Sequence, residues 1–166
     1  MCSLAHCRRL AAAKGTAVRV LKDQRQNYEV HCDENWLTHR VPVERTIGKD
    51  TKTLSLSVEN SGLWCCSGQE VAEVRGCLDV DLSLAPATNT LPIRRLDLGI
   101  GESESVTAAW IKFPELELQP LAQRYTRTAE NIYRYESDTR FSAEIMVDDL
   151  GLVTAYPRGW ERIATF

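Results

Sequence analysis

Long apolar segments and a strong charge of one sign are both missing from this chain of 166 residues. No stretch reaches the roughly 18 apolar residues that a membrane-spanning helix needs, so we expect no transmembrane segment. The 20 basic and 23 acidic side chains leave a net charge of -3 at pH 7. Because nucleic acid attracts proteins that carry a strong positive field, we expect no nucleic-acid partner.

Motifs of covalent catalysis, phosphate binding and metal binding are absent as well. There is neither a G-x-S-x-G turn nor a glycine-rich dinucleotide fingerprint. The three histidines do not follow the spacing of zinc ligands. We therefore expect no metal and no cofactor.

The six cysteines do not have the spacing of a disulfide framework. Cys65 and Cys66 are adjacent, and no C-x-x-C pair occurs. At the N-terminus the arginines follow a short apolar patch, which inverts the order of a signal peptide. Free thiols and no export signal together favour a cytoplasmic location.

Most of the chain alternates apolar and polar residues with a period of two, which is typical of half-buried β-strands. Turn residues separate or interrupt these stretches, which are 26–33, 53–64, 77–84, 105–113, 115–119, 131–137 and 140–157. Within them we predict turns at residues 60–62 and 148–151. Residues 4–14 are rich in alanine and precede Gly15, so we predict a short helix there. The pattern predicts one antiparallel all-β domain over residues 21–166, after an extension (1–20) that is helical or poorly ordered.

Residues 79–98, DVDLSLAPATNTLPIRRLDL, contain the densest set of polar groups. Asp79 and Asp81 share one face of a predicted strand, where two carboxylates can split their pKa values for acid–base chemistry or simply face solvent. Arg94 and Arg95 are adjacent in a second predicted strand and so point to opposite faces, which places Arg94 on the apolar side. An inward-facing arginine needs a carboxylate or the oxygens of a ligand as its partner.

Short polar and aromatic side chains follow two further patterns. Thr88, Asn89 and Thr90 lie between two prolines; such residues usually close turns, but a preorganised cluster of them can also hold a polyhydroxylated molecule. In YPRGWER, Tyr156 and Trp160 alternate with arginines. That pattern suits either stacking on a sugar ring or an ordinary surface strand.

Several stretches resemble a bacterial family described as glycolipid-binding, once catalogued only as a domain of unknown function. They are YEVHCDENWLTHRV, GLW, GCLDVDLSLAPATNTLPIRRLDL, QRY and FSAEIMVDDLGLVTAYPRGWER, between Tyr28 and Arg162. The resemblance implies many antiparallel strands in a curved, partly closed, barrel-like sheet, similar to periplasmic lipoprotein carriers. Family members usually begin with more strand, and the alanine-rich segment is expected to replace it here.

The resemblance also implies a ligand site of polar and aromatic side chains. Its partner would be a glycolipid or another amphipathic small molecule, with lipid chains on an apolar concave wall and the polar head at one end. Carried over position by position, the site residues are Asp33, Trp36, Arg40, Trp64, Asp79, Asp81, Thr88, Asn89, Thr90, Arg94, Arg95, Gln123, Tyr125, Tyr156 and Trp160.

Three functional hypotheses follow from these residues. The first, which we favour, is a binding module without catalytic residues. The second is a hydrolase or transferase acting on a glycoconjugate, with Asp79 and Asp81 or Asp33 as acid and base. The third is a structural or interaction domain in which buried aspartate–arginine pairs set the strand register.

Overall fold

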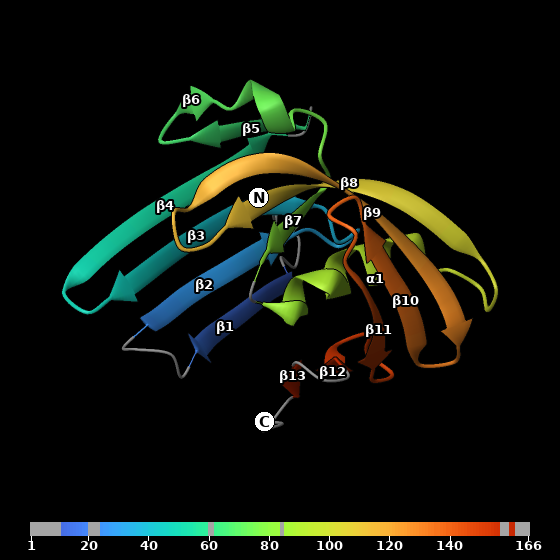
Figure 1. Cartoon of the computed structure of the whole chain (residues 1–166). Helices are drawn as coiled ribbons and strands as arrows, with labels where there is room; N and C mark the ends of the chain where they lie inside the picture. Colours follow the sequence, from blue (N-terminus) through green and yellow to red (C-terminus); the bar gives the residue numbers. More distant parts are fainter. Residues whose placement is uncertain (1–10, 20–23, 60–61, 84, 157–159, 162–166) are drawn as a thin grey trace, which may run out of the picture.

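The structure is a computed structural model that describes residues 11–19, 24–59, 62–83, 85–156 and 160–161. Within these ranges the chain forms two curved sheets, and the second sheet curls into a half-barrel (Figure 1). This confirms the predicted all-β class and the curved, partly closed shape.

The first sheet is an antiparallel meander whose spatial order equals its chain order. Its strands are β1 (Ala11–Arg19), β2 (Gln24–Cys32), β3 (Thr38–Ile47), β4 (Asp50–Glu59), β5 (Leu63–Cys66) and β6 (Gln69–Glu70). The second sheet has the order β13-β12-β11-β10-β9-β8-β7. Its strands are β7 (Asp79–Leu82), β8 (Ser103–Lys112), β9 (Glu117–Ala129), β10 (Ile132–Ser137), β11 (Ser142–Val147), β12 (Val153–Tyr156) and β13 (Trp160–Glu161).

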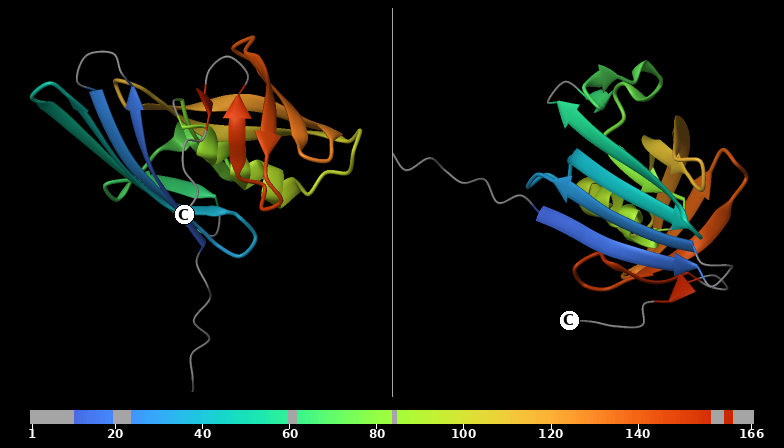
Figure 2. Two further views of the ribbon diagram at one scale, coloured as in Figure 1. Left: turned by 90° about the horizontal axis from the view of Figure 1, so that it is seen from below. Right: turned by 90° about the vertical axis from the view of Figure 1, so that its left-hand side faces the viewer.

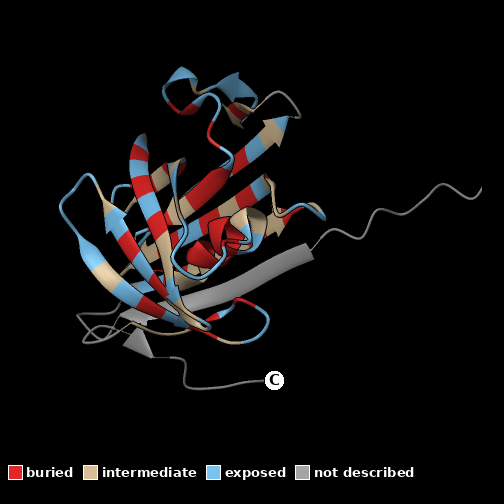
Figure 3. Ribbon diagram, turned by 90° about the vertical axis from the view of Figure 1, so that its right-hand side faces the viewer, coloured by how far each residue is buried: buried red, intermediate tan, exposed pale blue. Residues whose placement is uncertain are grey.

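The predicted period of two is visible as stripes of buried and exposed residues along the strands (Figure 3). In β4, Leu56 is buried while the neighbouring Ser55 and Ser57 are exposed. In β11, Ile145 is buried and Met146 is exposed. A strand that covers a core with one face requires this alternation, so the pattern located these two strands correctly. It missed β3, and it included only the first three residues of β9.

One pair of strands departs from the predicted antiparallel arrangement. β7 and β8 are parallel, with Asp79 opposite Ala108 and Leu82 opposite Ile111. Parallel neighbours need a crossover connection, which is usually helical. Two helical segments between the strands supply it: the 3-10 helix η2 (Pro86–Asn89) and the helix α1 (Thr90–Leu96).

The prediction that Arg94 and Arg95 lie in a strand is therefore wrong. Pro92 lies in the first turn of α1, where a helix does not use its missing N–H. The two arginines occupy the last turn, where the helix dipole favours positive charge. The helix ends at Asp97, which has a left-handed backbone with φ of 45°.

The predicted N-terminal helix is also wrong where the structure can be compared with it. Residues 11–14 lie in β1, which pairs with β2 so that Ala11 is opposite Cys32; residues 1–10 lie outside the described ranges. Strand, rather than a replacement for it, thus precedes the Tyr28 motif. Alanine favours helix only weakly, and pairing with a neighbouring strand overrides such a preference.

The helix α1 lies between the two sheets and contacts both cores (Figures 1 and 2). Leu91 belongs to the apolar cluster between the sheets, together with Val41, Leu56 and others. Ile93 belongs to the cluster inside the half-barrel, which includes Ile145. The chain's own crossover thus packs against the apolar residues of both sheets, where the resemblance led us to expect lipid chains.

Replacing Leu91 with alanine tests whether this packing holds the crossover in place. Because Leu91 is buried, Leu91→Ala should lower the free energy of unfolding by about 2–5 kcal/mol. The matched control is Leu78→Ala, whose side chain is 43% exposed and which should cost less than about 1 kcal/mol. Chemical denaturation of both variants measures the difference; equal losses would contradict the packing described here.

Candidate functional site

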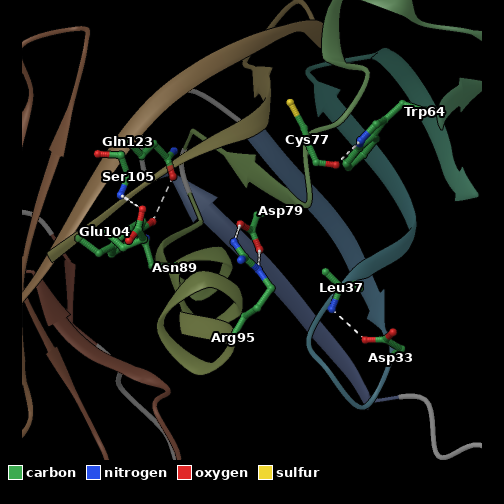
Figure 4. A network of polar contacts seen from close by, with 11 residues as sticks. Asp33, Leu37, Trp64, Cys77, Asp79, Asn89, Arg95, Glu104, Ser105 and Gln123 are labelled. Atoms are coloured by element: carbon green, nitrogen blue, oxygen red, sulfur yellow. Dashed lines mark hydrogen bonds and ion pairs between the residues drawn. The ribbon is translucent and has the colours of Figure 1, made fainter. Parts of the chain in front are cut away.

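A buried ion pair joins α1 to the half-barrel. Asp79 on β7 is 1% exposed. Arg95 donates from Nε to Oδ1 at 3.3 Å and from Nη2 to Oδ2 at 2.5 Å (Figure 4). Burial raises the pKa of Asp79, while the Arg95 guanidinium acts in the opposite direction. The inward-facing arginine is therefore Arg95, whereas Arg94, which the strand prediction turned inward, is exposed.

Asn89 ties the crossover to two further strands. The Tyr125 hydroxyl on β9 donates to Asn89 Oδ1 at 2.7 Å and lies 3.2 Å from Gln123 Oε1. Asn89 Nδ2 lies 2.6 Å from the Tyr156 hydroxyl on β12 and 3.0 Å from the backbone oxygen of Pro86. Both ends of the Asn89 amide are thus satisfied by the protein itself.

Asp81 is the second carboxyl of this network. Gln123 Nε2 donates to Asp81 Oδ2 at 2.5 Å. Burial raises the pKa of Asp81 to about 6, against the lowering effect of hydrogen bonds from Gln123 and Tyr135. Burial also raises the pKa values of Tyr125, Tyr135 and Tyr156 above their ordinary value. These tyrosines therefore remain protonated hydrogen-bonding groups at neutral pH.

The threonines beside Asn89 have separate local environments. The Thr88 hydroxyl donates to the backbone oxygen of Ala85 at 3.0 Å and accepts from the amide of Leu82 at 3.4 Å. The hydroxyl of Thr90 is buried and has no hydrogen-bond partner among the described residues. Both side chains face the interior and are shielded from solvent.

The other predicted site residues do not come together with this network. Trp64 is a core residue whose Nε1 donates to the backbone oxygen of Cys77 at 2.8 Å. Asp33 closes the loop between β2 and β3 by accepting from two backbone amides, each at 2.9 Å. Arg40 is exposed on β3. Trp160 is in β13, and its side chain lies outside what the structure describes.

Arg94 connects α1 to two loops. Its guanidinium carbon lies 5.2 Å from the centre of the Trp36 ring, which is the geometry of a cation–π contact. Its aliphatic stem covers Gly151 in the turn between β11 and β12, where a Cβ would lie 2.7 Å from Arg94 Cδ. Because Gly151 also has φ of +74°, glycine is the residue that suits this contact.

A polar cavity of about 390 Å³ lies beside Arg94. Three segments build it: the C-terminal part of α1, the region around the β9–β10 turn and the region around the β11–β12 turn. Its lining residues are Ile93, Arg94, Asp97, Arg127, Glu130, Asn131, Tyr133, Val147, Asp148, Asp149 and Gly151. Figure 1 shows these connections at the same end of the second sheet.

Tyr133 and Arg127 form one wall of the cavity. The Arg127 guanidinium carbon lies 5.7 Å from the centre of the Tyr133 ring. Burial raises the pKa of the Tyr133 hydroxyl, while the positive charges of Arg127 and Arg94 lower it. The wall is therefore held by a stacked arginine and offers a neutral hydroxyl at ordinary pH.

Exposed aliphatic side chains accompany the polar lining. Leu150 is 65% exposed and Leu152 is 37% exposed, and both flank Gly151 in the β11–β12 turn. Ile100 is 65% exposed in a loop whose Gly101 amide donates to the backbone oxygen of Arg127 at 2.7 Å. Apolar side chains and hydrogen-bonding groups thus occur together at this end of the molecule.

Sequence reasoning identified only one member of this cavity, Arg94. The acidic turn at 148–151 was predicted correctly as a turn, but its carboxylates were not linked to a site. Tyr133 lies in a strand that was also predicted. No local pattern shows that these segments meet α1, because the contact depends on the crossover between β7 and β8.

Across the described ranges, no group of three or more His, Cys, Asp and Glu side chains is placed to hold a metal ion. None of the helices that the structure describes has both the length and the apolar character needed to cross a membrane.

Comparison with known proteins identifies the family. Residues 2–162 match the family described as "Putative glycolipid-binding". The chain belongs to this family. The structure is also similar to the crystal structure of a DUF1089 family protein from Pseudomonas aeruginosa, with a TM-score of 0.80. The two sequences are 28% identical, and the alignment covers 98% of this chain and 99% of the other. No curated protein matches the chain.

Replacing Arg95 tests how strongly the fold depends on the partner of the buried Asp79 carboxyl. Arg95→Ala leaves the Asp79 carboxyl without its cation and should lower the free energy of unfolding by about 3–5 kcal/mol. Arg94→Ala, in the same helix turn but exposed, should cost about 1 kcal/mol. Urea denaturation at neutral pH compares the two, and an Arg95→Ala loss no larger than that of Arg94→Ala would contradict the role of the ion pair.

Asp81→Asn should change how stability depends on pH. In the folded protein Asp81 holds its proton up to about pH 6, whereas in the unfolded chain it loses it near its ordinary pKa of 3.8. The contribution of Asp81 to the free energy of unfolding therefore falls as pH rises between these values. The free energy of unfolding of Asp81→Asn, measured relative to that of wild type, should therefore be higher above pH 6 than below pH 3.8 by up to about 3 kcal/mol.

Denaturation of wild type and variant across this pH range tests the prediction. A difference between wild type and Asp81→Asn that does not vary with pH would contradict the raised pKa of Asp81.

Proposed function

We propose that this protein binds a glycolipid or a similar amphipathic small molecule without chemical turnover, and that the cavity beside Arg94 receives the polar head. The observation that carries the proposal is the combination of a polar cavity of about 390 Å³ with exposed aliphatic side chains next to it. Its size lies in the range of about 300–1,000 Å³ that is typical of small-molecule sites. The family description is consistent with such a ligand.

The arrangement of the crossover affects where the lipid part would lie. Leu91 and Ile93 cover the concave walls of the two sheets, so an acyl chain would have to displace α1 to reach them. Leu150, Leu152 and Ile100 are exposed without any such rearrangement. The start of the lipid chain would therefore lie along these three side chains and shield them from water.

A catalytic role has less support from the carboxylates. A glycosidase needs two carboxyl groups facing each other across an open cleft. Asp79 is bound to Arg95, and Asp33 accepts from backbone amides. Neither these two nor Asp81 lines the cavity. The Asp79–Arg95 pair instead suits the structural role of our third hypothesis, within a protein that binds its ligand elsewhere.

Arg94→Ala tests the proposal directly. Native mass spectrometry and solvent extraction of the wild-type protein purified from its host should detect a bound lipid or glycolipid. The variant should hold the same molecule about tenfold more weakly, because a charged hydrogen-bond donor at the cavity is lost. Arg124→Ala, an exposed arginine on β9 that does not line the cavity, is the matched control and should retain it. Recovery of no lipid from wild type or control would contradict the proposal.

A further inference from the structure

The charges of the cavity narrow the chemistry of its ligand. We infer that the cavity selects an uncharged sugar head group and rejects head groups that carry a phosphate or a carboxylate. This inference rests on the proposed function, because it assumes that the cavity beside Arg94 receives a head group.

Negative side chains outnumber positive ones around the cavity. Its carboxylates are those of Asp97, Glu130, Asp148 and Asp149. Its guanidinium groups are those of Arg94 and Arg127. An anionic head group entering the cavity would meet a net excess of like charge, which is unfavourable in a partly enclosed site where water screens charge less well than in bulk.

Arg127 is also poorly placed to compensate for an anion. Its Nη1 donates to the backbone oxygen of Leu98 at 2.9 Å, and its Nε and Nη2 donate to the backbone oxygen of Glu130 at 3.2 and 2.7 Å. Arginine recognises phosphate best with two parallel donors from the same guanidinium. Three of the five N–H donors of this guanidinium, including the adjacent pair on Nε and Nη2, are thus engaged with backbone, which leaves only one N–H on each Nη for an anion.

Arg94 is the second guanidinium, and its position is fixed from two sides. Trp36 lies against its charged end and Gly151 against its stem. It can donate hydrogen bonds to a ligand at the cavity, but it is a single cation facing several carboxylates. A lone donor of this kind suits the ring or hydroxyl oxygens of a sugar as well as it suits an anion.

The remaining lining groups match a polyhydroxylated ligand. Carboxylates accept hydrogen bonds from hydroxyl groups, while the amide of Asn131 and the hydroxyl of Tyr133 can each donate and accept. Asp148 Oδ1 already accepts from the amides of Leu150 and Leu152, at 3.1 and 2.9 Å. It shapes the turn, and a sugar would therefore use the other acceptors. A sugar offers many neutral hydroxyl groups, so it can satisfy this mixture without bringing a charge.

Vesicle sedimentation with the full-length protein tests the inference. Three sets of vesicles are compared: phosphatidylcholine alone, phosphatidylcholine with a neutral monoglycosyl diacylglycerol, and phosphatidylcholine with anionic phosphatidylglycerol. We expect binding to the glycolipid vesicles and measurable but about tenfold weaker binding to the anionic ones. Asp97→Asn and Asp149→Asn should each raise affinity for the anionic vesicles by roughly threefold, the effect of one charge about 7 Å away in a mostly aqueous medium.

The variants are chosen so that folding is preserved. Asparagine tolerates the left-handed backbone of Asp97, and at Asp149 it has the same shape as the aspartate it replaces. The control variant is Asp138→Asn, at an exposed position in the turn between β10 and β11. It removes one negative charge from the end of the sheet opposite the cavity and should leave binding to both vesicle types unchanged. An equal rise in anionic binding for Asp138→Asn would assign the effect to overall charge and overturn the inference.

The experiment also separates this inference from the function on which it rests. If wild type binds phosphatidylglycerol vesicles as well as or better than glycolipid vesicles, the inferred selection is wrong while binding of an amphipathic molecule stands. If wild type binds neither and yields no lipid on extraction from its host, the proposed function itself fails. Binding to glycolipid vesicles that Arg94→Ala weakens about tenfold and Arg124→Ala preserves, together with weaker binding to anionic vesicles, supports both.

Discussion

The parallel pairing of β7 with β8 is the constraint on which the rest of the structure depends. Two parallel neighbours cannot be joined by a tight turn, so the chain must cross from one end of the sheet to the other. Residues 83–102 make that crossing, and α1 comes to lie between the two sheets. The helix contributes to both apolar clusters and carries Arg94 to the edge of the half-barrel.

The polar residues that make residues 79–98 conspicuous mostly hold this crossover in position. Asp79 and Arg95 neutralise each other, and the amide of Asn89 is satisfied by Tyr125, Tyr156 and backbone. A buried ion pair contributes little net stability compared with apolar packing, but it makes any other placement of the helix costly because a charge would be left alone. The network therefore specifies where α1 lies.

The candidate binding site lies at the end of this framework, in the cavity beside Arg94. The cavity is built from the end of α1 and from turns, which is where proteins commonly place binding residues on a rigid framework. The full-length similarity to the DUF1089 protein from Pseudomonas aeruginosa shows that the framework is shared. This end of the molecule combines hydrogen-bonding groups with exposed aliphatic side chains.

The sequence by itself determined the class of fold, the strands with regular alternation and two turns, because a period of two directly reflects which face of a strand is buried. The turn at 148–151 and the hairpin that joins β4 to β5 were predicted in this way. The sequence did not identify β1 or β3. The tertiary structure alone decided that β7 pairs in parallel, that residues 90–96 are helical and that Arg95 rather than Arg94 faces Asp79. It also decided that Arg94, Tyr133 and Asp149 share one cavity. Local alternation cannot contain such information, because each of these outcomes depends on contacts between segments that are distant in the chain.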